Sequence, residues 1–369
     1  MGKKSSPTLA DIARASGYSK GSVSRALSLS EAMCPLRPES RAHIIKVASE
    51  MGYRVNPHAR ALSKGRSQTI ALAYEGPSPI LHSVYSYMLG EIVSELRARD
   101  FYLLMLAIDD TRWWEDALLT GRVDGVICLH EMPERLARVV TSEDLPTVLI
   151  NGRADADIAS IYPDDTAAAR EATRHLIDHG HRDIVFVHAK WDDRDHYSLE
   201  DRRLGFRQAL ETAGIDAEGR VISGAYNALV TVAAKRPTMP TAILAYSHFE
   251  GVTALRQLQE RGLSVPGDVS LMCFNDAYPV GELQPPMTCM AVPAVEVSRR
   301  GVQMLIEQIE SDGDETPAEG GAAATSAGAG GGGGSAAGTL ARRVRRRRRQ
   351  VVVTEKLIQR DSVAPPPRG

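Results

Sequence analysis

The chain has 369 residues, of which 43% are hydrophobic and 24% are charged, as is typical of a globular protein with more than one domain. This composition excludes a disulfide mini-protein, wholesale disorder and a membrane protein. The four cysteines are far apart and form no CxxC pair, which argues against a zinc site or a disulfide framework and favours a reducing compartment.

The net charge of −2 conceals a strong asymmetry along the chain. Residues 1–66 carry 12 Lys and Arg against 4 Asp and Glu, residues 67–341 carry 22 against 40, and residues 342–369 carry 10 against 2. This distribution predicts a small head that binds a polyanion, attached to an acidic body that does not itself bind nucleic acid. No apolar stretch has the length of a signal peptide or a membrane span, so we expect a cytoplasmic protein without a membrane partner.

Three short helices are predicted in the first 55 residues. The first follows Thr8, a good N-cap residue, and is broken by Gly17. The second covers about residues 20–27. The third runs from about Pro38 to Met51 and is followed by Gly52. It is expected to bury Ile44, Ile45, Val47, Ala48 and Met51.

From residue 69 onward, β-type apolar runs alternate with amphipathic helices in two successive series. The first series contains IALAY, a helix at 84–99, YLLMLAI, a short helix, DGVICLH and PTVLING. The second contains helices at 165–178, 201–213, 250–261 and 294–310, with strands at DIVFVHA, RVISG, TAILAY and VSLMCF. This alternation predicts two doubly wound α/β lobes with parallel sheets and a cleft between them. A low-complexity Gly/Ala/Arg-rich insertion at 313–349 precedes VVVTEKLI, which is interpreted as one further strand.

At TLADIARASGYSKGSVSRAL the sequence resembles the helix-turn-helix of the LacI/GalR (lactose-repressor/galactose-repressor) family of bacterial transcriptional regulators. The resemblance continues through PESRAHIIKVASEMGYRVNPHARALSKGRSQTIAL, DRRLGF, GLSVPGDVSLMCFNDA and LQPPMT, and so covers nearly the whole chain. It implies a small all-α helix-turn-helix domain at 1–55 and a hinge helix and linker at 56–68. Residues 69–369 would form a periplasmic-binding-protein-like core that binds an effector and dimerises.

A recognition helix must enter the major groove with short side chains near its start, so that a few longer ones reach base edges. Lys20 is the best candidate for a guanine contact, Gly21 permits close approach, and Arg25 would read a base or clamp a phosphate. The resemblance implies that Lys20 and Gly21 set operator choice, and that Leu62 of the hinge helix wedges into the minor groove. The alternatives are a solvated polar helix face and a core position for Leu62. The expected DNA-binding residues are Thr8, Leu9, Ser19, Lys20, Gly21, Ser22, Ser24, Arg25, Tyr53, Asn56 and Leu62.

The effector is expected among loops at the carboxyl ends of strands from both lobes. Arg202 is the strongest candidate because its guanidinium can bind a carboxylate bidentately or bridge two hydroxyls, and it matches the ligand-contacting arginine of the family. The alternative for Arg202 is a surface salt bridge to Asp201 or Asp195, and for the others it is loop capping. The expected effector-binding residues are His82, Ser83, Asn151, Arg153, Arg202, Ser247, His248, Asn275 and Asp276.

The chain also departs from the family pattern. The segment between the second and third helices looks about three residues longer than usual, and Arg37 stands where a helix-capping serine is usual. In the core, Ser247 and His248 replace an Asn-Asp pair, and PILHSVY replaces an Asn-Pro-Phe-Phe-like segment. These departures lie at pocket positions, so the resemblance does not name a particular sugar.

Enzyme-like motifs fail on their context. GYSKG at 17–21 follows a helix and not a strand, so it is no nucleophile elbow. His175 and His179 fit the last turn of a helix before Gly180 better than a metal site. We therefore expect no catalytic residue, metal or cofactor. The expected function is that of a homodimeric, nucleoid-associated repressor that binds a palindromic double-stranded DNA operator under control of a small sugar-like effector. The alternative is a solute-binding or sugar-processing protein with an incidental basic N-terminus.

Overall fold

The computed structural model describes residues 7–28, 33–53, 66–75, 83–154, 158–189, 196–224, 232, 238–313 and 349–367. The chain divides into two compact units, Met1–Ser67 and Gln68–Gly369. The expected hinge residues Asn56 and Leu62, the candidate His82, and residues 314–348 of the insertion lie outside the described residues. No described helix is both long and apolar enough to cross a membrane.

Among its described residues, the first unit contains the helices α1 (Leu9–Ser16), α2 (Lys20–Ser28) and α3 (Pro38–Glu50). A capping box fixes the start of α1, because Thr8 Oγ1 accepts a bond from the Asp11 N–H while the Asp11 carboxylate accepts one from the Thr8 N–H. Gly17 ends this helix in the left-handed conformation, with φ of 75°. Both boundaries agree with the sequence prediction.

The core of the first unit is smaller than expected. Its buried residues include Ile12 and Val23 from the first two helices and Ile44 and Ala48 from α3. Val47 and Met51 are only partly buried, and the prediction for Ile45 is wrong, because its side chain is 38% exposed. A three-helix unit covers only a narrow stripe of each helix, and Ile45 lies next to that stripe and not on it.

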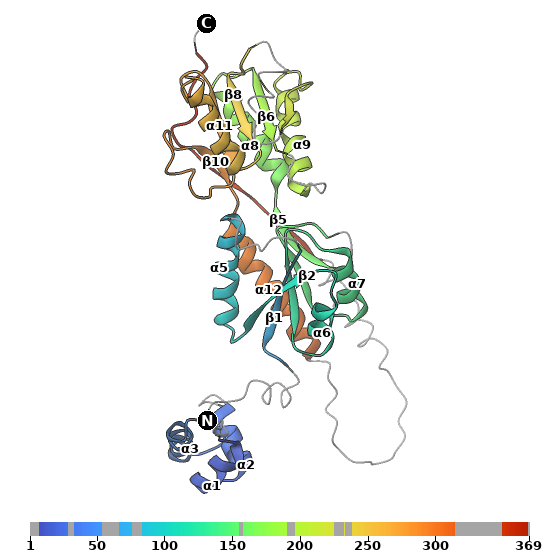
Figure 1. The fold of residues 1–369 in the computed structure, drawn as a ribbon, viewed down its shortest axis with the longest axis vertical. Coiled ribbons are helices and arrows are strands. Elements are labelled where there is room, and N and C mark those ends of the chain that lie inside the picture. Colours follow the sequence, from blue (N-terminus) through green and yellow to red (C-terminus); the bar gives the residue numbers. More distant parts are fainter. Residues whose placement is uncertain are drawn as a thin grey trace, which may run out of the picture. The chain divides into compact units, whose positions relative to one another are not determined.

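The first lobe of the second unit is a six-stranded sheet in the order β11-β5-β4-β3-β1-β2, with parallel pairing between neighbours. Helices α5 and α12 cover one face, while α6 and α7 cover the other (Figure 1). The strands are β1 (Thr69–Glu75), β2 (Tyr102–Ile108), β3 (Gly125–Leu129), β4 (Thr147–Ile150), β5 (Ala159–Pro163) and β11 (Gln350–Val353), and the helices are α5 (Ser83–Arg97), α6 (Trp113–Leu119), α7 (Glu134–Ser142) and α12 (Ala294–Gly313).

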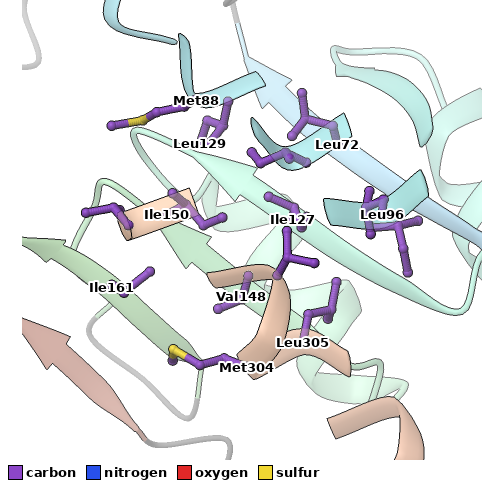
Figure 2. Close-up of a cluster of buried hydrophobic side chains, with 14 of the residues drawn as sticks. Leu72, Met88, Leu96, Ile127, Leu129, Val148, Ile150, Ile161, Met304 and Leu305 are labelled. Atoms are coloured by element: carbon purple, nitrogen blue, oxygen red, sulfur yellow. The ribbon is translucent and has the colours of Figure 1, made fainter. Parts of the chain in front are cut away.

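The interior of this lobe joins chain segments about 200 residues apart. Figure 2 shows Ile127 of β3 and Val148 of β4 beside Leu305 of α12, with Met88 and Leu96 contributed by α5. Gly125 and Gly301 keep this contact close, because a Cβ at Gly301 would lie 2.5 Å from Ile150 Cδ1. Burying such side chains contributes about 1.5 to 3 kcal/mol each, so this layer fixes the sheet against α12.

The second lobe is another six-stranded sheet, in the order β12-β10-β9-β8-β6-β7. Helices α8 and α9 pack on one face and α11 on the other (Figure 1). All its pairings are parallel except that of β12, which is antiparallel to β10. The strands are β6 (Ile184–His188), β7 (Val221–Ser223), β8 (Ala242–Ala245), β9 (Ser270–Phe274), β10 (Thr288–Ala291) and β12 (Lys356–Ile358), and the helices are α8 (Asp165–Asp178), α9 (Tyr197–Thr212) and α11 (His248–Glu260).

Two features of the second unit correct the sequence interpretation. The segment VVVTEKLI is not one strand, because it breaks at Thr354 and Glu355 and adds β11 to the first sheet and β12 to the second. Helix α12, expected in the second series, belongs to the first lobe. The chain therefore passes between the sheets three times among the described elements, from β5 to α8, from β10 to α12 and from β11 to β12.

Candidate functional site

The start of α2 exposes the polar side chains that the sequence selects for DNA recognition. Ser19 caps this helix, because its Oγ accepts a bond from the Ser22 N–H at 3.1 Å. Lys20, Gly21 and Arg25 are exposed, whereas Val23 faces the core of the unit. Helix α2 therefore has an apolar side that faces the core and an exposed polar side.

Gly21 is not required by the packing of the first unit. A Cβ at this position would meet nothing closer than Ser19 Oγ at 3.9 Å and Arg25 Nη2 at 4.0 Å. Its φ also lies outside the left-handed region that favours glycine. The absent side chain instead leaves the backbone of α2 open to an outside surface, between Lys20 and Arg25.

Three other expected DNA-binding residues in the first unit, Thr8, Leu9 and Tyr53, have structural partners. Leu9 and Tyr53 are partly buried and pack against the core of the unit, and burial raises the pKa of Tyr53. Thr8 is exposed and forms the capping box. Ser24 is half-buried on α2.

In the second unit, the carboxyl ends of three parallel strands carry residues with left-handed backbone. His130 follows β3 with φ of 75°, Asn151 follows β4 with φ of 57°, and Asn275 follows β9 with φ of 71°. This conformation is uncommon for residues other than glycine and tends to persist where the surroundings enforce it. Asn151 and Asn275 are both buried, each 8% exposed. The sheets therefore direct polar groups from their carboxyl ends into the interior.

A network of hydrogen bonds connects two of these strand ends, those of β3 and β4. Asn151 Nδ2 donates to Tyr85 Oη at 3.1 Å, and the Tyr85 hydroxyl also forms a hydrogen bond with His130 Nδ1 at 2.5 Å. Burial raises the pKa of Tyr85, so this hydroxyl stays protonated. These hydrogen bonds fix the orientation of the Asn151 and His130 side chains in the first lobe.

The hydrogen-bonded network continues into the second lobe beside a stacked pair of imidazoles. His130 and His196 lie with ring centroids 4.2 Å apart and planes 9° from parallel. His196 Nε2 donates to the Asn151 carbonyl oxygen at 2.9 Å, so in a neutral ring Nδ1 accepts from Ser198 at 2.8 Å. Ser198 Oγ lies 2.9 Å from the Tyr246 hydroxyl, at the end of β8.

Arg202 is buried at the same end of the second sheet, and its ion pair with Asp165 is buried as well. Its side chain is 5% exposed, and Nε bonds to Asp165 Oδ1 at 2.7 Å. Nη1 donates to the Tyr246 carbonyl oxygen at 2.6 Å, and the guanidinium lies 4.2 Å from the Phe274 ring centroid. Burial has the largest single effect and lowers the pKa of Arg202, but Asp165 and the weaker effects of its other neighbours together outweigh burial, so the net shift is upward.

The alternative of a surface salt bridge from Arg202 to Asp201 is wrong, because Asp201 pairs with Arg153. Arg153 Nη1 bonds to Asp201 Oδ1 at 3.1 Å, and Nη2 bonds to Oδ2. The guanidinium of Arg153 also lies about 5 Å from the ring centroids of Tyr162 and Tyr197. The pair joins the loop after β4 to α9, and therefore one lobe to the other. Asp195 lies outside the described residues.

The remaining expected effector residues differ in their surroundings. Ser83 Oγ, at the start of α5, lies 2.7 Å from His248 Nε2 of the other lobe. Ser247 caps α11 by accepting from the Phe249 N–H, as the capping alternative predicts. Asp276 pairs with Arg360 at 2.7 Å.

Sequence reasoning missed four polar residues that the structure places with Asn151, namely Tyr85, His130, His196 and Tyr246. His130 and Tyr246 directly follow the strands at DGVICL and TAILA, so the strand-end rule applied throughout would have selected them. Tyr85 and His196 carry no such signal, because they lie in or just before helices.

Comparisons with known proteins cover both units. Residues 173–322 match the model of the family described as periplasmic binding protein-like domain. The chain is 28% identical over 333 residues to the HTH-type transcriptional regulator CelR of Thermobifida fusca, covering 85% of this chain and 95% of that protein. The chain is thus similar along most of its length to HTH-type transcriptional regulators, as its resemblance to the LacI/GalR family implies.

Solved structures of this family share the fold. A lac repressor dimer bound to operator and an anti-inducer aligns with a TM-score of 0.73 at 20% identity, over 97% of this chain and 99% of that one. A complex of CelR with cellobiose aligns with a TM-score of 0.64 at 23% identity, over 97% of this chain and all of that one. These alignments extend over both units of the chain and show that the fold is shared.

Proposed function

We propose that this protein is a LacI/GalR-type repressor that binds a palindromic DNA operator as a homodimer and responds to a small polyhydroxy effector. The observation that carries the proposal is the exposed, basic start of α2 on a unit with its own core. A head built in this way is not an incidental extension, which disfavours the alternative of a solute-binding or sugar-processing protein.

On the DNA side, we infer that Lys20 and Arg25 contact bases or phosphates and that Gly21 admits the groove edge. Ser19, Ser22 and Ser24 are short enough to let α2 approach. Thr8, Leu9 and Tyr53 position the helices and present their backbone or polar atoms near phosphates. Asn56 and Leu62 are assigned to the hinge by family resemblance alone.

On the effector side, we infer a site at the carboxyl ends of both sheets, centred on Asn151 and Arg202. The hydroxyl of Tyr85 and the imidazoles of His130 and His196 lie in the same hydrogen-bonded chain. Amide, hydroxyl and imidazole groups suit the alternating donors and acceptors of a sugar. The complex of a relative, CelR, with cellobiose supports this ligand class. Ser83, Arg153, Ser247, His248, Asn275 and Asp276 remain candidates, together with His82.

The exposed apolar residues of the first lobe support the dimer. Tyr102 of β2 is 64% exposed on an edge strand, and Tyr87 of α5 is 54% exposed. An edge strand with exposed aromatic side chains is normally covered by a partner. Sedimentation of the full chain and of Tyr87→Asp tests this, since only the wild type should sediment as a dimer.

The DNA-binding proposal is tested by selecting fragments from a genomic library with the full chain and measuring their affinity by gel shift. A dimer that makes about 6 to 10 phosphate contacts should lose roughly 10³ to 10⁵ in affinity between 50 and 200 mM salt. Lys20→Ala should cost roughly 1 to 3 kcal/mol and relax the preference at one position in each half-site. A chain starting at Gln68 that bound as tightly would overturn the assignment to α2.

The effector proposal is tested by thermal shift with a panel of mono- and disaccharides that includes cellobiose. At least one should raise the Tm of the wild type and fail to raise that of Asn151→Ala, whose amide is expected to bond to the ligand. Arg299→Met, at an exposed pair on α12, is the matched control and should respond as the wild type does. An equal response of Asn151→Ala would remove this residue from the site.

A further inference from the structure

A cluster of buried charges lies where the chain passes between the two sheets. Asp165 begins α8 directly after the passage from β5, and Glu355 lies in the passage from β11 to β12. The backbones of the two passages are joined, because the Asp164 N–H donates to the Val353 carbonyl oxygen at 2.9 Å. Arg202 of α9 bonds to Asp165 at 2.7 Å and lies 4.0 Å from Glu355 Oε1.

The carboxyl group of Glu355 is not neutralised by direct bonding. Its side chain is fully buried, and neither oxygen has a hydrogen-bond partner within the described parts of the chain. The nearer oxygen lies beyond hydrogen-bond distance from Arg202, whose Nε and Nη1 are occupied by Asp165 and Tyr246. An ionised carboxylate in such surroundings carries a large desolvation cost.

The charged and titratable groups facing Glu355 do not offset that cost. Asp164 and Asp165 face it from the start of α8, and Arg202 and Tyr197 from α9. With both Glu355 and Asp165 ionised, two carboxylates would share one guanidinium. Burial first, and then the charge of Asp165, raise the pKa of Glu355 well above its ordinary value, against the opposing effect of Arg202.

We propose that Glu355 holds a proton in the folded protein and acts as a proton switch at the joint between the lobes. When Glu355 is protonated, the carboxylate of Asp165 pairs with the guanidinium of Arg202. The two passages then pack together without excess charge. Release of the proton to water places a second negative charge in the joint and weakens the contact between these passages. The inference goes beyond DNA and effector binding and stands whether or not the proposed function holds.

Infrared spectroscopy detects the proton on Glu355 directly, and the pH dependence of stability detects it indirectly. The infrared spectrum of the full-length wild type at neutral pH should contain the carbonyl stretch of a protonated carboxylic acid, which shifts on ¹³C labelling of glutamate. Glu355→Gln, which keeps the shape but cannot ionise, should lack this band. Glu134→Gln, an exposed residue of α7, is the matched control and should retain it.

The same proton sets the pH dependence of stability. Between the unfolded pKa near 4.3 and the folded pKa, the folded chain holds one proton that the unfolded chain has released. The folding equilibrium constant of the wild type should therefore fall by up to tenfold per pH unit relative to that of Glu355→Gln, measured by urea unfolding from pH 5 to pH 8.

Two results would overturn the proposal. The first is a wild-type spectrum without a protonated-carboxyl band from glutamate, which needs no variant and therefore holds even if Glu355→Gln fails to fold. The second is a constant difference in stability between wild type and Glu355→Gln across this pH range, since that shows Glu355 to be ionised in the folded state.

Discussion

Arg202 provides the sharpest test of how the second unit is held together. Replacing it with Met keeps most of the side-chain volume and removes the charge, which leaves Asp165 buried without a cation. Asp165 is 1% exposed in its side chain and its bond to Arg202 is 2.7 Å long. Removing one partner from a buried pair of this kind typically costs about 3 to 5 kcal/mol. We expect the free energy of unfolding of Arg202→Met to fall by this amount.

The assay is urea unfolding of the full chain followed by circular dichroism. In the double variant Arg202→Met/Asp165→Asn the loss should be smaller than the sum of the two single losses, by roughly 0.5 to 3 kcal/mol. Arg299→Met removes an exposed arginine paired with Glu91 and Glu95, and should cost less than about 1 kcal/mol. If Arg202→Met were as mild as Arg299→Met, the buried pair would not be stabilising and the reasoning would fail.

Gly205→Ala should destabilise the second lobe by about 1 to 3 kcal/mol, because the new Cβ would lie 2.2 Å from the Thr166 carbonyl oxygen. Gly90→Ala is the control and should not destabilise the protein, because nothing lies within 4 Å of its Cβ. Urea unfolding measures the free energy of unfolding of both variants. Thr8→Ala should cost about 1 kcal/mol by removing the α1 cap, seen as faster hydrogen exchange of the α1 amides with unchanged exchange in α8. Burial lowers the pKa of His181, so the folded state resists protonation of this imidazole. The free energy of unfolding of the wild type should therefore fall as the pH drops below about 6.5, and fall more steeply than that of His181→Gln. Equal pH dependence of the two proteins over that range would contradict this prediction.

The sequence pattern predicted most elements because each depends on local periodicity. The helix at 165–178 and the strand at YLLMLAI were placed at their observed bounds. Periodicity does not say which sheet an element joins, so α12 was assigned to the wrong lobe and VVVTEKLI was read as one strand. The elements not predicted were α7, β5 and β10, of which β10 is only four residues long.

Sequence patterns predict which single residues belong to the candidate sites, but not which distant residues they contact. The polar side of α2 follows from helical spacing, and strand ends located Asn151 and Asn275 without any tertiary information. Contacts between residues distant in sequence cannot be predicted from local patterns, and Arg202 is an example. Its pairing with Asp165 and its approach to Glu355 depend on how three separate segments meet, and nothing local encodes that meeting.

The division of residues 350–358 between β11 and β12 has a consequence for synthesis and for truncation. Each sheet receives its last edge strand from the same short segment near the end of the chain, so neither sheet is complete until the ribosome has made it. A protein ending at residue 349 would leave β5 and β10 as new exposed edges, one in each sheet. No single cut in the chain separates a complete first lobe from a complete second one, and a late stop codon would damage both together.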